Sequence, residues 1–148
     1  MIQLKQPNGW SCLPTAFASI VEEPVEDVFD YIGHNGSQIL WPDLEEPMCR
    51  RSFHIQEMYA YCLSKNYAVT TFTPKFGTSV LNADPFIECN KWMDDLLSHY
   101  FGVMTGTSSQ GNLHALAWDG TRFMDPQEGL MKDQEFLLSH FHVVTKII

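Results

Sequence analysis

The residues that could do chemistry begin with Cys12, in the segment QPNGWSCLPTAFASI that covers residues 6–20. Pro, Asn and Gly before the cysteine predict a tight loop, and the apolar residues after it predict a helix that starts at Cys12. Ser11 is a suitable N-cap, and Pro14 falls in the first turn, where its missing N–H does no harm. A helix dipole favours a thiolate at its N-terminus, so this segment fits both a nucleophilic Cys12 and a small cysteine packed in the core.

A second group of candidate residues lies in HALAWDGTRFMD, residues 114–125. Asp-Gly between two runs of alternating residues is a strong signal for a β-hairpin. A two-residue type I′ turn at Asp119–Gly120 would place His114 directly opposite Asp125. Opposed residues have their side chains on the same side of the sheet, so this register predicts a contact between the imidazole and the carboxylate.

These residue types together form a unit for acyl transfer. Asp125 would orient the His114 ring and stabilise its protonated form, and the other ring nitrogen would take the proton of Cys12. The side-chain amide of Gln6 and the backbone N–H of Cys12 could both donate hydrogen bonds to an oxyanion. We therefore predict a site made of Gln6, Cys12, His114 and Asp125, with no metal or organic cofactor.

Gln, five intervening residues, Cys at a helix start, and a late His followed by Asp resemble the papain-like cysteine peptidases. The small size and the late LHALAWDG…FMDP are most similar to the bacteriocin-leader peptidase domains and their relatives. The resemblance covers residues 6–20 and 112–127. The sequence departs from the family at Leu13, where Gly or Trp is common, and in the short His-to-Asp stretch.

The resemblance implies a papain-like fold in which Cys12 is the nucleophile, His114 the base, Asp125 the orienting acid and Gln6 the oxyanion donor. The implied activity is that of a cysteine hydrolase, a peptidase or isopeptidase, with a protein or peptide as substrate. A transglutaminase or a glutamine deamidase would use the same triad. A peptidase-like module that binds without turnover is the alternative from a different class.

Less specific interpretations stand beside these roles. Asp125 precedes Pro126, so a structural role in a turn competes with the catalytic one. Cys49, Cys62 and Cys89 are expected to be small buried residues. The histidines of HFH, residues 140–142, are expected at the surface or in packing, because they have no partners at zinc-site spacing.

The elements that must position these residues are helices followed by strands. This order predicts an α+β fold in a single domain, residues 1–148, with Cys12 on the helical part, His114 and Asp125 on an antiparallel sheet, and the site between them. We expect helices at 12–22, 24–32, 53–65 and 90–100, strands at 67–73 and 101–107, the hairpin at 114–125, a short helix or turn at 132–141 and a strand at 142–148. Two loops, 34–51 and 74–88, separate these elements.

Composition excludes other classes of function. The chain has 148 residues, 45% of them hydrophobic and 18% charged, as expected of a globular protein. A net charge of -9 with nine Lys and Arg argues against nucleic-acid binding. Without a signal-peptide pattern, a membrane-length apolar run or a disulfide-like cysteine spacing, we expect a cytoplasmic protein with reduced thiols that does not bind membranes. The oligomeric state stays open.

The loop at 34–51 is a candidate wall of the substrate cleft. It combines Trp41 and Leu44 with the acidic Asp43, Glu45 and Glu46. An acidic wall would favour substrates with Lys or Arg near the scissile bond. The alternative is a loop that only covers the core with Ile39, Leu40 and Trp41.

Overall fold

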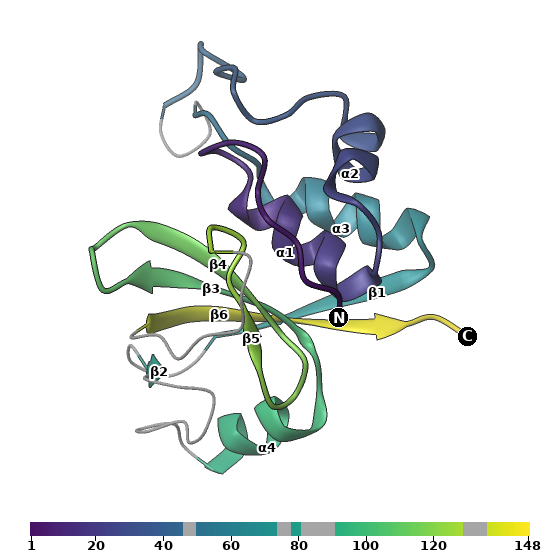
Figure 1. Cartoon of the computed structure of the whole chain (residues 1–148), viewed down its shortest axis with the longest axis vertical. Helices are drawn as coiled ribbons and strands as arrows, with labels where there is room; N and C mark the ends of the chain where they lie inside the picture. The colour runs from purple at the N-terminus through teal and green to yellow at the C-terminus, as the bar shows by residue number, and fades with distance from the viewer. Residues whose placement is uncertain (46–49, 74–77, 81–90, 129–135) are drawn as a thin grey trace.

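The structure is a computed structural model of the chain, and it describes residues 1–45, 50–73, 78–80, 91–128 and 136–148. Three helices come first in the chain, and strands dominate the rest (Figure 1). The helices are α1 (Cys12–Val21), α2 (Val25–Ile32), α3 (Ile55–Ser64) and α4 (Lys91–His99). The strands are β1 (Tyr67–Phe72), β2 (Thr78–Val80), β3 (Gly102–Ser108), β4 (Leu113–Trp118), β5 (Phe123–Met124) and β6 (Phe136–Lys146).

The described strands form one antiparallel sheet in the order β1-β6-β3-β4-β5, and β2 pairs with the first part of β6. The long strand β6 is central, because it pairs with β3 along one side and with β1 and β2 along the other. The α+β architecture of helices combined with an antiparallel sheet therefore agrees with the expectation from the sequence.

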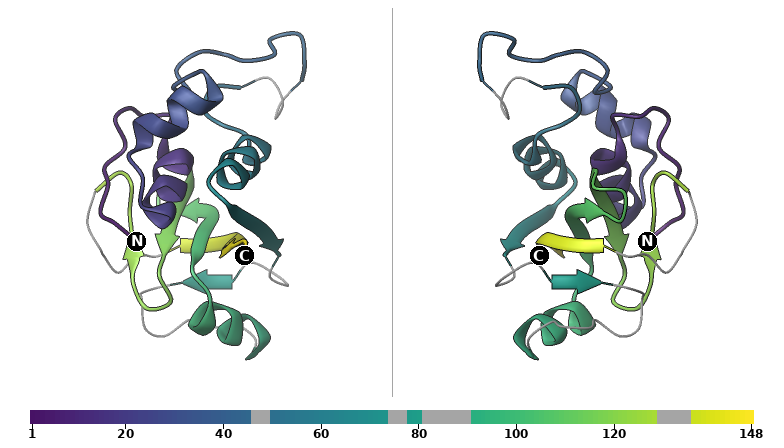
Figure 2. Two further views of the ribbon diagram at one scale, coloured as in Figure 1. Left: turned by 90° about the vertical axis from the view of Figure 1, so that its right-hand side faces the viewer. Right: turned by 90° about the vertical axis from the view of Figure 1, so that its left-hand side faces the viewer.

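Helices cover both faces of this sheet. Figures 1 and 2 show α1, α2 and α3 on one side and α4 on the other. Residues of β4 alternate between the two sides: Ala115 and Ala117 belong to the core with α1, whereas Leu116 and Trp118 belong to the core with α4. Small alanines let α1 approach the sheet closely, which places its N-terminus near the start of β4.

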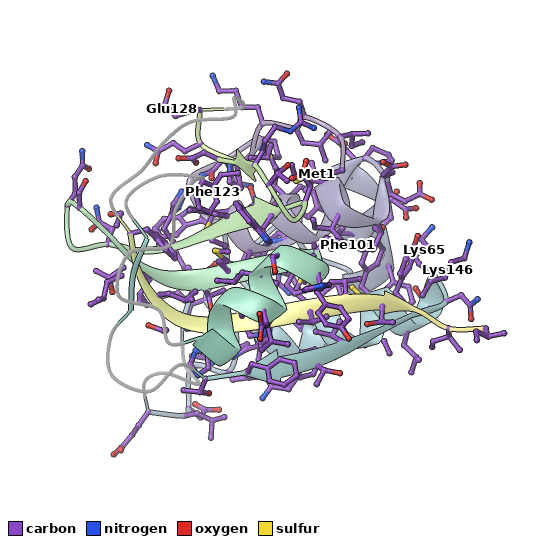
Figure 3. The ribbon with its side chains drawn as sticks, turned by 90° about the horizontal axis from the view of Figure 1, so that it is seen from below. Met1, Lys65, Phe101, Phe123, Glu128 and Lys146 are labelled. Atoms are coloured by element: carbon purple, nitrogen blue, oxygen red, sulfur yellow. The ribbon has the colours of Figure 1, made fainter. Side chains whose placement is uncertain are left out.

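A hydrogen bond between β4 and α4 holds α4 on the other face of the sheet. The indole Nε1 of Trp118 donates a hydrogen bond to the Leu97 carbonyl oxygen over 2.7 Å, and both side chains are fully buried. Seen from below, α4 lies across the sheet on this side (Figure 3). A buried indole N–H requires such a partner, so this hydrogen bond ties α4 to β4.

The ends of the first two helices agree with the sequence signals. Cys12 is the first residue of α1, and Ser11 occupies the N-cap position, although its hydroxyl does not cap the helix. Pro24 precedes α2. The helix ends at Ile32 and is followed by Gly33 with φ 92°, the left-handed conformation that glycine adopts most readily. These ends place the thiol of Cys12 at the predicted point of the chain.

Two predictions about elements are wrong. The loop expected at 74–88 contains the short strand β2, Thr78–Val80, which pairs with β6. We expected a short helix or turn at 132–141, but residues from Phe136 onward form the first half of β6. Phe136 and Leu138 are buried and Leu137 is exposed, which is the alternation of a strand. Pairing with β3 and β2 on both sides outweighs the helical propensity of this segment. Residues 132–135 lie outside the described residues.

No helix in the described part of the chain is both long and apolar enough to cross a membrane.

Candidate active site

His114 and Asp125 are in direct contact. The ring Nε2 of His114 lies 2.9 Å from Asp125 Oδ1, and the two side chains are only 10% and 6% exposed. Asp125 Oδ1 also accepts a hydrogen bond from the backbone N–H of Gln127 over 2.9 Å. The carboxylate is therefore held from two sides, and it fixes the orientation of the imidazole.

The route to this contact differs from the predicted one. The structure pairs Ala117 with Met124 rather than with Arg122, so the hairpin register is shifted. Continued one residue further, the observed register places Asp125 beside Leu116, the residue two positions along β4 from His114. The carboxylate reaches the imidazole from just beyond the end of β5, as a diagonal rather than a direct neighbour.

The turn explains the shifted register. Asp119 Oδ1 accepts hydrogen bonds from the backbone N–H groups of Thr121 and Arg122, at 3.0 and 2.7 Å. The backbone N–H of Asp119 in turn donates to the carbonyl oxygen of Arg122 over 3.2 Å. The loop therefore spans residues 119–122, because the Asp119 carboxylate takes two N–H groups that a two-residue turn would leave to the strands.

Cys12 lies close to the His114 ring. The thiol is half-buried, and its interaction with the imidazole is one of the causes that raise the pKa of His114. Since Nε2 faces Asp125, Nδ1 is the ring nitrogen left for the sulfur. The structure thus brings Cys12, His114 and Asp125 close together.

This position changes the protonation of His114. Burial favours the neutral ring and lowers its pKa, but the hydrogen bonds and charges of Asp125 and Cys12 favour the imidazolium more strongly. The net effect raises the pKa of His114 to about 9. A protonated imidazole next to a sulfur can donate its proton to a group that is bound to that sulfur.

Gln6 lies beside the same loop as Asp125. Its backbone N–H donates to the carbonyl oxygen of Pro126 over 2.7 Å, which ties the residue to the position after Asp125. Its side-chain Nε2 donates to the carbonyl oxygen of Asn8 over 2.9 Å, while Oε1 is buried and has no hydrogen-bond partner. Nε2 carries two hydrogens, so one remains available to a ligand.

The remaining cysteines do not join the site. Cys62 is fully buried on α3, and burial raises the pKa of its thiol to about 12. This agrees with the packing role expected from the sequence. Cys49 and Cys89, and the acidic residue Glu46, lie outside the described residues.

The loop that follows α2 touches the segment before Cys12. The hydroxyl of Ser52 donates to the Trp10 carbonyl oxygen over 2.7 Å, and the Arg51 guanidinium lies 5.1 Å from the centre of the Trp10 ring. Ile39 and Trp41 are about half exposed, at 52% and 47%. The Trp41 ring lies 4.6 Å from the ring of the buried His54, so both interpretations of the loop stay predictions.

Sequence reasoning missed a second buried histidine with polar partners. His142 Nδ1 lies 2.8 Å from Thr71 Oγ1, and Nε2 lies 3.0 Å from Thr105 Oγ1. Burial, with a smaller contribution from the charge of His140, lowers the pKa of His142 to about 4. In the described part of the chain, no three His, Cys, Asp or Glu residues are grouped to hold a metal ion. Residues 141–144 of β6 are all buried, so alternation along the strand would not have singled out His142.

The exposure of Leu113 was also not predicted from the sequence. Leu113 directly precedes His114, and 79% of its side chain is exposed, although it belongs to a strand. No signal in the sequence separates this leucine from the buried leucines of the same sheet.

Comparison with known proteins provides no further information about the function of this site. No protein-family model matches the chain, and no curated protein matches it.

Proposed function

We propose that the protein is a cysteine hydrolase, a peptidase or isopeptidase with a papain-like arrangement of its site. One observation carries the proposal: His114 contacts the carboxylate of Asp125 and interacts with the thiol of Cys12, which begins α1. A buried histidine beside a carboxylate and a thiol can hold and move a proton at the sulfur. A cysteine that only packs in the core does not need a histidine and a carboxylate beside its thiol.

The papain-like part of the proposal is supported by chain order and layering. A helix that begins with the cysteine packs on an antiparallel sheet, and the sheet supplies the histidine and then the aspartate. The same order of residues was the basis of the resemblance drawn from the sequence.

The reaction follows from the positions of the protons. The Cys12 sulfur adds to an amide carbonyl carbon, and the carbonyl oxygen becomes an oxyanion that accepts hydrogen bonds from the Cys12 N–H and Gln6 Nε2. As the C–N bond breaks, protonated His114 gives its proton to the leaving amine, and a thioester remains. His114 then takes a proton from water, whose oxygen displaces the sulfur and releases the acid.

The acceptor in the second step decides between hydrolysis and its alternatives. Water produces a peptidase, an isopeptidase or a glutamine deamidase, whereas an amine produces a transglutaminase. The proposed substrate is a protein or peptide, the proposed compartment is the cytoplasm, and no nucleic acid or membrane takes part.

The first prediction is that Cys12→Ala and His114→Ala each abolish turnover while the protein stays folded. The two residues act as one proton-transfer unit, so either loss should lower kcat by several orders of magnitude. The measurement is release of amine and acid from a panel of peptides and isopeptide-linked conjugates, with circular dichroism on the same samples. An added primary amine separates hydrolysis from transfer.

Cys62→Ala is the matched control, because it removes a thiol that is fully buried away from the site. It should reduce stability and leave the activity of the folded protein in place. If folded His114→Ala keeps the wild-type rate, the chain is not an enzyme of this mechanism, and a binding module becomes the better interpretation.

A further inference from the structure

The segment between Gln6 and Cys12 folds around Asn8. The carbonyl oxygen of Asn8 accepts hydrogen bonds from Gln6 Nε2 over 2.9 Å and from Ser11 Oγ over 3.2 Å. Ser11 directly precedes Cys12, so a single carbonyl group holds the residues on both sides of the proposed oxyanion hole. This explains why the Ser11 hydroxyl does not cap α1.

The side chain of Asn8 determines where that carbonyl points. Its Oδ1 accepts a hydrogen bond from the backbone N–H of Trp10 over 2.8 Å, which closes a tight turn between the two residues. Its Nδ2 donates to the carbonyl oxygen of Asn35 over 3.0 Å. Both ends of the amide are thus engaged, one within the segment and one in the loop after α2.

That loop supports the turn from a second side. Ser52 donates through its hydroxyl to the carbonyl oxygen of Trp10 and through its backbone N–H to the carbonyl oxygen of Gly36, over 2.7 and 2.8 Å. Residues 8–10 are therefore held at Asn8 by Asn35 and at Trp10 by Ser52.

The Asn8 carbonyl also fixes the orientation of the Gln6 amide. A half-turn of that amide would bring Oε1 against the Asn8 oxygen, and two acceptors would face each other. The carbonyl therefore keeps Nε2 on the side of the segment that leads to Cys12. Gln6 Oε1 stays buried without a partner, so the orientation does not depend on any contact made by the oxygen.

We propose that Asn8 is a positioning residue, which sets the Gln6 amide and the Cys12 backbone N–H as a pre-formed pair of oxyanion donors. The inference rests on the proposed function, because it assigns a role within the same site. Asn8 does not touch the substrate. It acts only through the two donors, so its loss should matter only in reactions that form an oxyanion.

Two reactions of Cys12 separate this role from a general effect on the thiol. In acylation by p-nitrophenyl acetate, the sulfur adds to the ester carbon, the oxygen becomes an oxyanion, and nitrophenolate leaves. In alkylation by iodoacetamide, the sulfur displaces iodide and no oxyanion forms. Mass spectrometry of the Cys12 peptide gives both rate constants, and their ratio measures the contribution of the oxyanion hole.

The expected result is that Asn8→Ala lowers this ratio about tenfold, since a misplaced donor loses much of its effect. Gln6→Ala should lower it about a hundredfold. In the Gln6→Ala background, Asn8→Ala should then lower the ratio much less than it does alone. Asn8→Asp keeps the acceptor for the Trp10 N–H but loses the donor to Asn35, so it should fall between wild type and Asn8→Ala.

Asn66→Ala is the matched control. Asn66 also joins distant parts of the chain, because its Nδ2 donates to the Ile147 carbonyl oxygen over 2.9 Å, but it lies outside the site. It should lower thermal stability and leave the ratio unchanged.

The inference is overturned if Asn8→Ala keeps the wild-type ratio, or if its effect adds fully to that of Gln6→Ala. If Asn8→Ala does not fold, the same comparisons are made with Asn8→Asp, which retains the turn. Failure of the proposed function looks different: the ester would not acylate Cys12 of the wild-type protein at all, and both proposals would then fall.

Discussion

At the scale of single residues, the contact between His114 and Asp125 was predictable although its register was not. Alternation along a hairpin puts every second residue on the same side. A register shift of two residues, from Arg122 to Met124 opposite Ala117, therefore leaves His114 and Asp125 on one side as diagonal neighbours. The contact of Cys12 with the His114 ring could be predicted only from the residue types, because a cysteine nucleophile needs a base. No local pattern links residue 12 to residue 114, and packing of α1 on β4 brings them together.

The second prediction concerns Asp125→Asn. An asparagine can still accept a hydrogen bond from His114 Nε2, but it does not stabilise the imidazolium by charge. We expect turnover to fall at least several-fold, but less than in Cys12→Ala, and the pKa of His114 to fall below its present value of about 9. Steady-state kinetics and an NMR titration of the ring measure the two effects.

An unchanged rate would assign Asp125 to the turn that begins at Pro126. Asp119→Asn is the control, because it alters the other aspartate of the hairpin, which binds Arg122 at the far end of β4. It should affect stability without changing the titration of His114.

At the scale of elements, the sequence predicted the helices better than the last strand. The starts of α1 and α2 lie where the local residues Ser11 and Pro24 predicted them, although the Ser11 hydroxyl does not cap α1. The first half of β6 depends on partners far away in the chain, β2 and β3. Local propensity carries no information about such partners, which is why this segment was mistaken for a helix or turn.

The third prediction concerns the close approach of β3 and β6. A Cβ at Gly106 would lie 2.1 Å from the Leu137 carbonyl oxygen, at the point where the register between the two strands shifts. Gly106→Ala should force the strands apart and lower the free energy of unfolding by about 2 kcal/mol. Gly106 pairs with His114, so turnover should fall as well.

Chemical denaturation and kinetics on the same preparation test this pair of effects. Gly9→Ala is the steric control for stability, since a Cβ there meets no atom within 4 Å. Equal stability of Gly106→Ala and wild type would show that β3 and β6 tolerate a wider separation.

The fourth prediction concerns the acidic loop. Asp43 and Glu45 are exposed, and the loop contacts the segment that leads to Cys12. If the loop forms a wall of the substrate cleft, changing Asp43, Glu45 and Glu46 together to Asn, Gln and Gln should lower kcat/KM for peptides with Lys or Arg near the scissile bond. Uncharged peptides should be affected less, because they gain nothing from opposite charge.

A control with the same loss of charge removes Glu26, Asp30 and Asp95, which are exposed on α2 and α4. It should leave the ratio between basic and uncharged peptides as in the wild type. If the ratio also stays constant in the loop variant, the loop does not select substrates by charge.

At the scale of the whole molecule, two buried histidines give opposite pH dependences. The folded pKa of His114, about 9, is above the ordinary value of 6.5, so its stabilising contribution is complete below pH 6.5 and is lost as the pH rises through 9. The folded pKa of His142, about 4, is below that value, so the unfolded state binds a proton more readily than the folded state. The stability of the folded state therefore decreases as the pH falls below 6.5.

The fifth prediction is therefore a maximum of stability near pH 6.5. Urea denaturation between pH 5 and 9 should show stability falling on both sides, by up to about 3 kcal/mol on the alkaline side. Asp125→Asn should flatten the alkaline side. His142→Asn, which can still contact Thr71 and Thr105, should flatten the acidic side. A profile that neither variant changes would contradict both assignments.

The central position of β6 has a consequence for synthesis on the ribosome. Gln6, Cys12, His114 and Asp125 all leave the ribosome before β6, yet β1 and β3 are joined only through that strand. Until residues 136–146 emerge, β1 has no described strand partner and the sheet that carries His114 lacks its central strand. The thiol and its base are therefore translated before the central strand, and we expect the sheet that supports them to be complete only after residues 136–146 have emerged.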